Sequence, residues 1–164
     1  MPASTVIKTF VDATVNIKDG TGTPIEMTVS LENGDFSLSG LMSGQKETSV
    51  YLDRGAFASI RHTNQTFPTI SLSAHMAYLT DNTNGSLLDV VRKTGEFASA
   101  VSTLGANAEV MAYLVELVIE GTDHGDSADH TITLDDVVMS VDFSEGDPNS
   151  FSLSGTVYGS ITIA

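Results

Sequence analysis

The densest group of side chains able to do chemistry lies between residues 123 and 130. Three aspartates and two histidines occur in this run, and the candidate metal ligands are Asp123, Asp126, Asp129 and His130. Carboxylate oxygens suit calcium or magnesium, and imidazole nitrogens suit zinc. The run lacks the ligand order of an EF-hand, and no second cluster supplies a completing set. A divalent-metal site and a solvated acidic loop between two strands therefore remain the two interpretations.

Motifs for other chemistry are missing from the sequence. It has no cysteine, no G-x-S-x-G elbow, no phosphate-binding P-loop and no dinucleotide glycine signature. The many serines alternate along strand-like segments, where no identified base would activate a hydroxyl. Asp135 and Asp136 are adjacent, so a strand would point them to opposite faces. We expect no enzyme activity and no cofactor; an unrecognised enzyme would need two carboxylates meeting across a cleft.

Period-two alternation of apolar and polar residues predicts a chain built mainly from strands. The first two strands are expected at about residues 7–17 and 25–31. The Asn33-Gly34 turn predicts a hairpin between the second strand and a third that begins at Phe36. Further strands are expected in four later segments, at residues 69–80, 110–120, 131–143 and 151–163. The last segment is long for one strand, so Gly155 and Gly159 are expected to bend it.

The sequence F-S-L-S-G occurs twice, at residues 36–40 and 151–155. Each copy follows an acidic turn that contains glycine. In an extended chain the Phe and Leu side chains share one face and the serines share the other. We expect two equivalent sheet-building units, with Phe and Leu inward and Ser outward. The small polar face is a water-facing surface, a lumen lining or a contact to another subunit.

One short helix is expected after Gly85. Ser86 is placed to cap its first turn, Asp89 occupies the acidic position of a capping box, and Gly95 is placed to end it. The following residues, 96–107, are interpreted as a connection. The pattern predicts a mainly β fold with one short α-helix, in a single domain that spans residues 1–164.

The segment around residues 111–119 is apolar on both faces. Tyr113, Val115 and Leu117 predict a core face, yet Leu114 and Val118 make the opposite face apolar as well. Either the helix covers that second face or a neighbouring molecule does. The residues predicted for a subunit interface are Leu114, Val118, Ser152 and Ser154.

Charge is distributed unevenly along the chain. The formal net charge is −14, and all seven Lys and Arg residues precede residue 94, whereas twelve Asp and Glu residues follow it. A surface built from the C-terminal half would repel DNA. The acidity either aids solubility or forms a wall that a polyanion passes without sticking. No apolar run approaches the ~20 residues that span a bilayer, so no membrane segment is expected.

The order of these features resembles a major tail tube protein of a long-tailed bacteriophage, in the superfamily of tail tubes and type VI secretion tubes. The resemblance rests on the N-terminal strand, the predicted hairpin at residues 31–37, the stretch Tyr51-Leu52-Asp53-Arg54-Gly55 that leads through residues 61–72, the capped helix, and the acidic, strand-rich second half. It covers most of the chain but includes no single diagnostic motif.

The resemblance implies a mainly β fold, a two-sheet β-sandwich or barrel with one short flanking α-helix. It also implies a structural virion protein. Six subunits would form a ring in which inner strands join edge to edge, and rings would stack into a hollow tail tube for DNA delivery. Implied partners are further copies of the chain, tail tip and terminator proteins, and transiting DNA bound without sequence specificity. The implied location is the virion tail, with assembly in the host cytoplasm. The implied ring-stacking loop, within residues 40–50, contains Gly40, Gly44, Gln45, Lys46 and Glu47.

A ligand- or carbohydrate-binding β-sandwich module is the alternative from another class. Such modules display aromatic platforms for sugar rings, whereas this chain has no Trp and four Tyr. That composition counts against the alternative.

Overall fold

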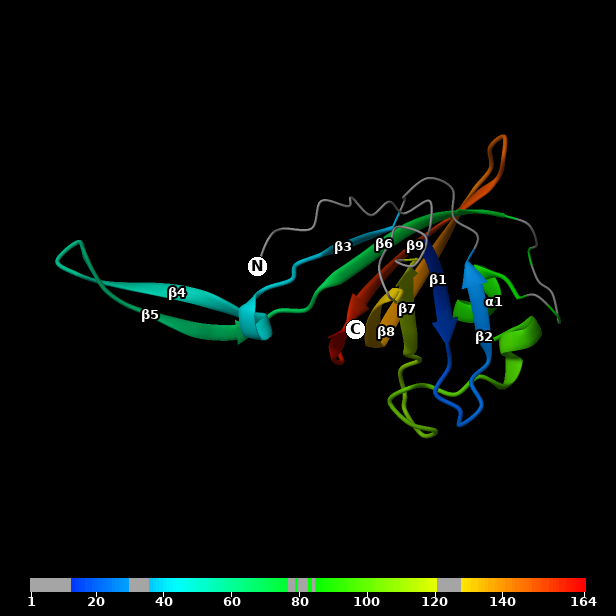
Figure 1. The fold of residues 1–164 in the computed structure, drawn as a ribbon, viewed down its shortest axis with the longest axis horizontal. Helices are drawn as coiled ribbons and strands as arrows, with labels where there is room; N and C mark the ends of the chain where they lie inside the picture. The colour runs from blue at the N-terminus through cyan, green and yellow to red at the C-terminus, as the bar shows by residue number, and fades with distance from the viewer. Residues whose placement is uncertain (1–12, 30–35, 77–78, 80–82, 84, 121–127) are drawn as a thin grey trace.

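The computed structural model describes residues 13–29, 36–76, 79, 83, 85–120 and 128–164 (Figure 1). The described residues form ten strands, one α-helix and two short 3₁₀ helices, at Ser43–Gln45 and Gly95–Ser99. The helix α1 spans Leu87–Arg92. The strands are β1 Ala13–Lys18, β2 Glu26–Val29, β3 Ser37–Ser39, β4 Lys46–Asp53, β5 Ala56–Gln65, β6 Thr69–His75, β7 Tyr113–Ile119, β8 His130–Ser144, β9 Ser150–Val157 and β10 Ile161–Ile163.

Eight strands form one antiparallel sheet in the order β2-β1-β7-β8-β9-β6-β3, and β10 also pairs with β8. The strand β8 joins two halves of this sheet. Its first half, up to Val137, pairs with β7, and its second half, from Val137 onward, pairs with β9. The second sheet consists of β4 and β5 alone. The predicted fold class, mainly β with two sheets and one short helix, is confirmed; the described strands do not close into a barrel.

A single hydrophobic core lies between the two halves of the large sheet. Its buried side chains come from β1, β2 and β7 on one side, from β6, β8 and β9 on the other, and from α1 and the adjacent 3₁₀ helix. The largest fully buried residues include Tyr113, Phe97, Ile17, Ile70, Leu117, Leu134 and Leu153. Fully burying one such apolar side chain contributes roughly 1.5–3 kcal/mol. In the strands that line the core, the alternation seen in the sequence sets which face is buried.

The predicted hairpin at Asn33-Gly34 is wrong. The strand β2 pairs with β1, and β3 pairs with β6, at opposite ends of the strand order. The turn itself lies outside the described residues. Only seven residues, 30–36, separate the two strands. Val29 and Phe36 therefore lie at most about 25 Å apart. The sheet must curve enough to bring its two end strands within that distance.

The helix begins where the sequence predicts. Ser86 is the N-cap, and its Oγ accepts a hydrogen bond from Asp89 N at 3.1 Å. Asp89 is buried and lies 3.1 Å from the same Oγ through Oδ2. The helix ends earlier than expected, because Lys93, with φ of 52°, takes the left-handed C-cap position. Gly95 instead begins the 3₁₀ helix, so the predicted connection starts with helical structure.

The long C-terminal segment is divided into two strands. The strand β9 continues through Gly155, and the interruption falls at residues 158–160. A Cβ on Gly159 would lie 2.8 Å from the Asp135 backbone, so only glycine allows this close approach to β8. Within the described part of the chain, no helix has the length and apolar character required to cross a membrane.

Candidate functional site: assembly surfaces

The outer face of β3, β6, β9 and the second half of β8 consists mainly of small hydroxyl side chains. We call this surface the serine face. One row across the four strands consists of Ser37, Ser71, Ser154 and Ser140, which are aligned by strand register. The Oγ atoms of Ser37 and Ser71 lie 2.7 Å apart, and those of Ser140 and Ser154 lie 2.8 Å apart. These four serines are exposed in the single chain.

The two F-S-L-S-G copies flank the same strand. The strands β3 and β9 lie on either side of β6, and both run antiparallel to it. Phe36, Phe151 and Leu153 are buried and Leu38 packs against the core, whereas the serines of both copies are exposed. The prediction that Phe and Leu point inward and the serines outward is confirmed.

Both outer edges of the serine face are open in the described part of the chain. The strand β3 pairs with β6 on one side only. Beyond Val137, β8 pairs with β9 on one side, and no described strand pairs with its other side. Unpaired strand edges expose rows of N–H and C=O groups that can pair with another chain.

The serine face carries little charge. Among its described residues, the ionisable side chains are Asp142 on β8 and His75 on β6. At one end of the face, the turn between β8 and β9 carries Glu145 and Asp147. At the other end lies Pro68, whose carbonyl accepts a hydrogen bond from Val157 N at 2.9 Å. The face therefore has two chemically different ends.

The strands β4 and β5 form an arm that projects from the body of the molecule (Figure 1). The turn at its tip consists of Arg54 and Gly55, with φ of 49° and 84°. Positive φ at both central residues is the pattern of a type I′ hairpin turn, which matches the natural strand twist. At about 3.3 Å per residue, strands of this length carry the tip roughly 25 Å from the base of the arm.

One face of the arm is an exposed apolar strip. Strand register pairs Val50 with Ile60 and Leu52 with Phe57. These four residues, which we call the apolar strip, are 56%, 56%, 61% and 67% exposed in that order. The opposite face carries Tyr51 paired with Ser59. An isolated two-stranded hairpin is marginally stable in water, and an exposed apolar strip is typical of a surface that contacts another molecule.

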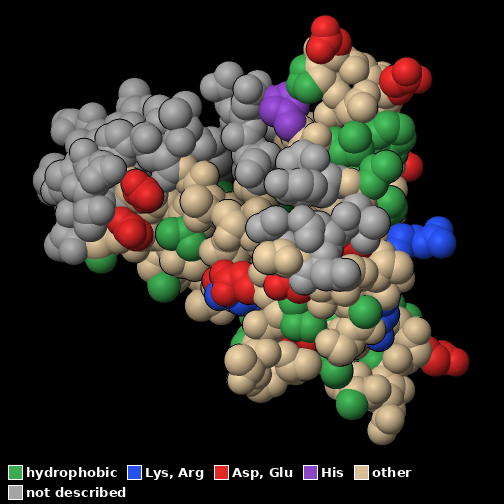
Figure 2. All heavy atoms as spheres, turned by 90° about the vertical axis from the view of Figure 1, so that its right-hand side faces the viewer, with side chains coloured by type: hydrophobic (Ala, Val, Ile, Leu, Met, Phe, Trp, Pro, Cys, Tyr) green, Lys and Arg blue, Asp and Glu red, His purple; other side chains and the backbone are tan. Residues whose placement is uncertain are grey.

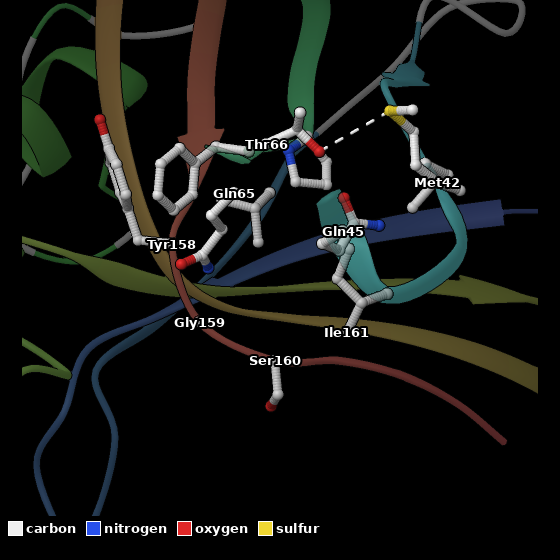
Figure 3. A pocket seen from close by; sticks show the side chains of 12 residues that line it. Met42, Gln45, Gln65, Thr66, Tyr158, Gly159, Ser160 and Ile161 are labelled. Atoms are coloured by element: carbon white, nitrogen blue, oxygen red, sulfur yellow. Dashed lines mark hydrogen bonds between the residues drawn. The ribbon is translucent and has the colours of Figure 1, made fainter. Parts of the chain in front are cut away.

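A groove of about 460 Å³ lies at the base of the arm (Figure 3). We call it the base groove. Its walls come from the residues before β4, from the end of β5 and from the segment between β9 and β10. The large side chains along it are Leu41, Met42, Phe67 and Tyr158, which are 42–53% exposed. The Phe67 and Tyr158 rings lie 4.9 Å apart between centroids.

The groove wall formed by residues 158–160 is joined to β8 by backbone hydrogen bonds. Tyr158 N donates to Asp136 O, and Gly159 N donates to Asp135 O, both at 3.1 Å. Asp135 N donates in turn to Ser160 O at 2.9 Å. A Cβ on Gly159 would lie 2.8 Å from Asp136 Oδ2, so a carboxylate sits directly behind this wall.

The opposite wall contains Gln45, a residue with two unusual features. Its φ is 47°, which is uncommon for a residue other than glycine. Its Oε1 is buried, and no described group donates a hydrogen bond to it. Strained backbone and unpaired buried acceptors concentrate where a structure serves a function beyond its own stability. Gln45 belongs to the predicted stacking loop, which thus forms part of the base groove.

The rest of the predicted stacking loop is divided between two structures. Gly40 lies in the irregular segment after β3, Gly44 lies in the 3₁₀ helix Ser43–Gln45, and Lys46 and Glu47 begin β4. The expectation of a loop through residue 50 is therefore wrong, because β4 already spans residues 46–50. Glu47 Oε2 accepts a hydrogen bond from Asn64 Nδ2 at 3.2 Å across the arm. The ring-stacking role itself stays a prediction.

The predicted interface residues occupy interior strands. Leu114 and Val118 are half-buried on β7, which lies between β1 and β8. The helix packs on the other face of β7, where Tyr113 Oη donates to Val90 O and the Tyr113 ring contacts Phe97. Ser152 and Ser154 lie on β9, flanked by β6 and β8. A neighbouring copy can reach these four residues only across a sheet face, so their interface role stays a prediction.

An ion pair lies on the face of β7 that carries Leu114 and Val118, and it involves Glu116 between them. Lys18 Nζ lies 2.6 Å from Glu116 Oε2 and 3.5 Å from Glu26 Oε1. The Glu116 hydrogen bond is the main cause that raises the pKa of Lys18 above its usual value. Because the pair is partly exposed, its contribution to stability is modest.

The candidate metal site is placed only in part. Asp123 and Asp126 lie outside the described residues, whereas Asp129 precedes β8 and His130 is its exposed first residue. The described residues contain no group of three or more potential ligands. Metal binding by residues 123–130 stays a prediction.

Seen from the side that carries β2 and α1, acidic side chains are scattered over the surface and basic side chains are few (Figure 2).

Comparisons with known proteins support a specific fold class. The chain is similar in structure to the sheath/tube terminator of an extracellular contractile injection system, PVC, with a TM-score of 0.55 at 13% identity over 100% of this chain and 97% of that one. It is equally similar to the tube-terminating cap of the anti-feeding prophage, AFP, with a TM-score of 0.56 at 13% identity over 100% and 95%. No protein-family model and no curated protein sequence matches the chain. The fold is that of tail components of contractile injection systems.

Proposed function

We propose that this chain is a structural tail protein that assembles into rings of six, which stack into a hollow tube for the passage of DNA. The observation that carries the proposal is the four-stranded serine face with its two open edges. All pairings within this face are antiparallel, so its two edge strands, β8 and β3, run in opposite directions. A β3 edge can therefore continue the antiparallel order by pairing with β8 of the next copy.

The number six comes from the resemblance to tail tubes. Six copies would form a channel wide enough for a DNA duplex. Six copies of four strands give a barrel of about 24 strands. With strands ~4.8 Å apart and tilted by about 40°, the backbone diameter is on the order of 45 Å. Serine and threonine side chains would line such a lumen. They offer DNA no cations to release its counterions, so the duplex would pass without adhering.

The fold comparisons support the same class, because the similar structures are tail components. Within the proposal, the partners are further copies and other tail proteins, the location is the tail of a phage-like particle, and the chain has no catalytic role. The ligand-binding alternative gains no support from the comparisons.

Lysine substitutions at the two edges test the proposal. Ser37→Lys on β3 and Ser140→Lys on β8 place cations next to the proposed seam, and edge lysines block strand addition. We expect the double variant to remain a folded monomer, whereas the wild-type protein forms rings or hollow filaments by negative-stain microscopy at high concentration. Circular dichroism would check the fold.

Ser73→Lys is the matched control. It lies on the same face but on β6, a strand with partners on both sides. We expect this variant to assemble. Monomeric wild-type protein at millimolar concentration, or normal filaments from the double edge variant, would contradict the proposal.

A further inference from the structure

The strand β8 changes partners at Val137, and the register of the sheet shifts beside this residue. The two rows that enclose the shift pass through Leu134 and Val137. Between these rows the chain advances by two residues in β7 (113–115), by three in β8 (134–137) and by four from β9 to β10 (157–161). Each strand thus uses one residue more than its neighbour. An extra residue bends a strand and increases its local twist, so the large sheet bends here.

Three residues form this bend, and we call them the corner: Asp135, Asp136 and Gly159. Asp136 has φ of 51°, a left-handed conformation that aspartate tolerates better than most residues other than glycine. Gly159 faces β8, where a Cβ would lie 2.8 Å from the Asp135 backbone. A bulge and a close-packed glycine are features that produce curvature in β-sheets. The corner therefore determines the angle between the two halves of the large sheet.

A loop of the body is attached to the corner through one side-chain hydrogen bond. Thr103 Oγ1 donates to Asp136 Oδ1 at 2.7 Å, and both residues are half-buried. The same loop is bound to the β1–β2 turn, because Val101 N donates to Asp19 Oδ2 at 3.0 Å and Gly20 N donates to Val101 O at 2.7 Å. Through this loop, β1 and β2 are connected to the point where β8 bends.

We propose that the corner holds the two halves of the large sheet at one angle, and that the Thr103–Asp136 hydrogen bond fixes this angle. Without that bond, the half that carries the serine face can take a range of orientations relative to the half that contains β1, β2 and β7. Thr103 and Asp136 are therefore positioning residues for the serine face.

The open edge of β8 begins at the corner. This edge and β7 lie on the same side of β8, since Val137 pairs with Tyr113 on one side and with Val157 on the other. The angle at the corner therefore sets how far β7 turns away from a strand that approaches the edge. Within the proposed function, on which this step rests, a fixed angle keeps the β8 edge accessible to β3 of the next copy.

Spin labels on the two halves measure the angle, because the sequence contains no cysteine that would take up label elsewhere. Thr14→Cys on β1 and Ser152→Cys on β9 place the labels at exposed positions. Double electron–electron resonance on dilute, monomeric protein should give one narrow distribution of distances between the labels. Because a hydrogen bond to a charged group shifts a conformational equilibrium by roughly tenfold, adding Thr103→Val should broaden the distribution about twofold.

Two further variants are the controls. Asp136→Asn keeps an acceptor oxygen for Thr103 and a residue that tolerates the left-handed conformation, so the distribution should stay narrow. Thr48→Val, the same substitution on the exposed arm, should also leave it unchanged. Circular dichroism checks that each variant is folded.

Assembly of the same variants without labels gives the second measurement. By negative-stain microscopy, Thr103→Val should raise the protein concentration needed for rings or tubes by roughly tenfold. Asp136→Asn and Thr48→Val should assemble like the wild-type protein.

The outcomes separate this proposal from the proposed function. A broad distribution with weakened assembly in Thr103→Val supports the corner. A narrow distribution in that variant overturns it, whether or not rings form. A broad distribution with normal assembly overturns the link between the corner and the β8 edge. Absence of rings from the wild-type protein contradicts the proposed function, whereas the label distances still decide whether the corner fixes the angle.

Discussion

The Asp19 carboxylate is buried, with 3% of the residue exposed, and it links two loops through hydrogen bonds. Oδ1 accepts from Ile25 N and from Thr21 Oγ1, both at 2.8 Å. Oδ2 accepts from Val101 N at 3.0 Å, across 82 residues of sequence. One side chain thus connects the β1–β2 turn to the segment that follows the 3₁₀ helix.

Replacing Asp19 by Ala should therefore be costly. Four donors would lose their acceptor in a buried site. We therefore expect the free energy of unfolding to fall by about 3 kcal/mol. Urea unfolding followed by circular dichroism measures the change. Asp142→Ala, which removes an exposed carboxylate, is the comparison and should stay within about 0.5 kcal/mol. Similar losses in the two variants would show that the Asp19 network contributes little.

The buried phenol of Tyr113 predicts that the stability of the protein depends on pH. Burial, and secondarily the negative charge of Asp19, raise the pKa of Tyr113 to about 12 from its usual value of 10. The unfolded chain releases this proton first, so the stabilising contribution is complete below pH 10 and declines between pH 10 and 12. We expect Tyr113→Phe to remove one phenolate step near pH 12, measured by ultraviolet absorbance of the folded protein. An unchanged titration would contradict this assignment.

Among the elements, the helix and the body strands were predictable and the arm was not. Ser86 and Asp89 predicted the helix start because capping is local chemistry. The buried faces of β6 to β9 followed from alternation, since each has one face in the core. In the arm, both faces are exposed, so alternation carries no burial signal. Its Arg54-Gly55 turn differs from the Asn-Gly and Asp-Gly pairs that identify hairpins most strongly.

The C-cap of α1 gives a prediction at the element scale. Lys93 occupies a left-handed conformation that costs a non-glycine residue roughly 1 kcal/mol. Lys93→Gly should therefore stabilise the protein by about 0.5–1 kcal/mol, seen as a higher melting temperature. Arg92→Gly, inside the helix by one residue, should instead destabilise it by about 1 kcal/mol. A loss of stability in Lys93→Gly would contradict the expected relief of backbone strain.

At the scale of the whole molecule, the sheet order depends on contacts between distant segments. The turn chemistry of Asn33-Gly34 suggested pairing of neighbours, yet β2 and β3 end up at opposite ends of the sheet. Local sequence reports which residues turn and which are buried, whereas partner choice depends on how all strands share one core. The serine face was foreseen as a polar surface, but its open edges became visible only with the register.

A cation added to the serine face tests the position of that face in an assembly. Ser73→Lys would place one cation per subunit on the wall of the proposed channel, on the interior strand β6. We expect rings and tubes to form normally but to retain duplex DNA at low salt, with retention falling steeply as salt rises. Asn107→Lys, the same charge change on an exposed loop, should leave DNA retention near the wild-type level. Equal retention by the two variants would place Ser73 outside the channel.

The two unlike ends of the serine face have a consequence for any polymer of this chain. If every subunit joins its neighbour through β3 and β8, all subunits point the same way along the axis. One rim then bears the acidic β8–β9 turns and the other lies near Pro68 and the arm bases. Such a filament is polar: its two ends expose different residues. A protein that starts its growth and a protein that stops it must recognise different chemistry.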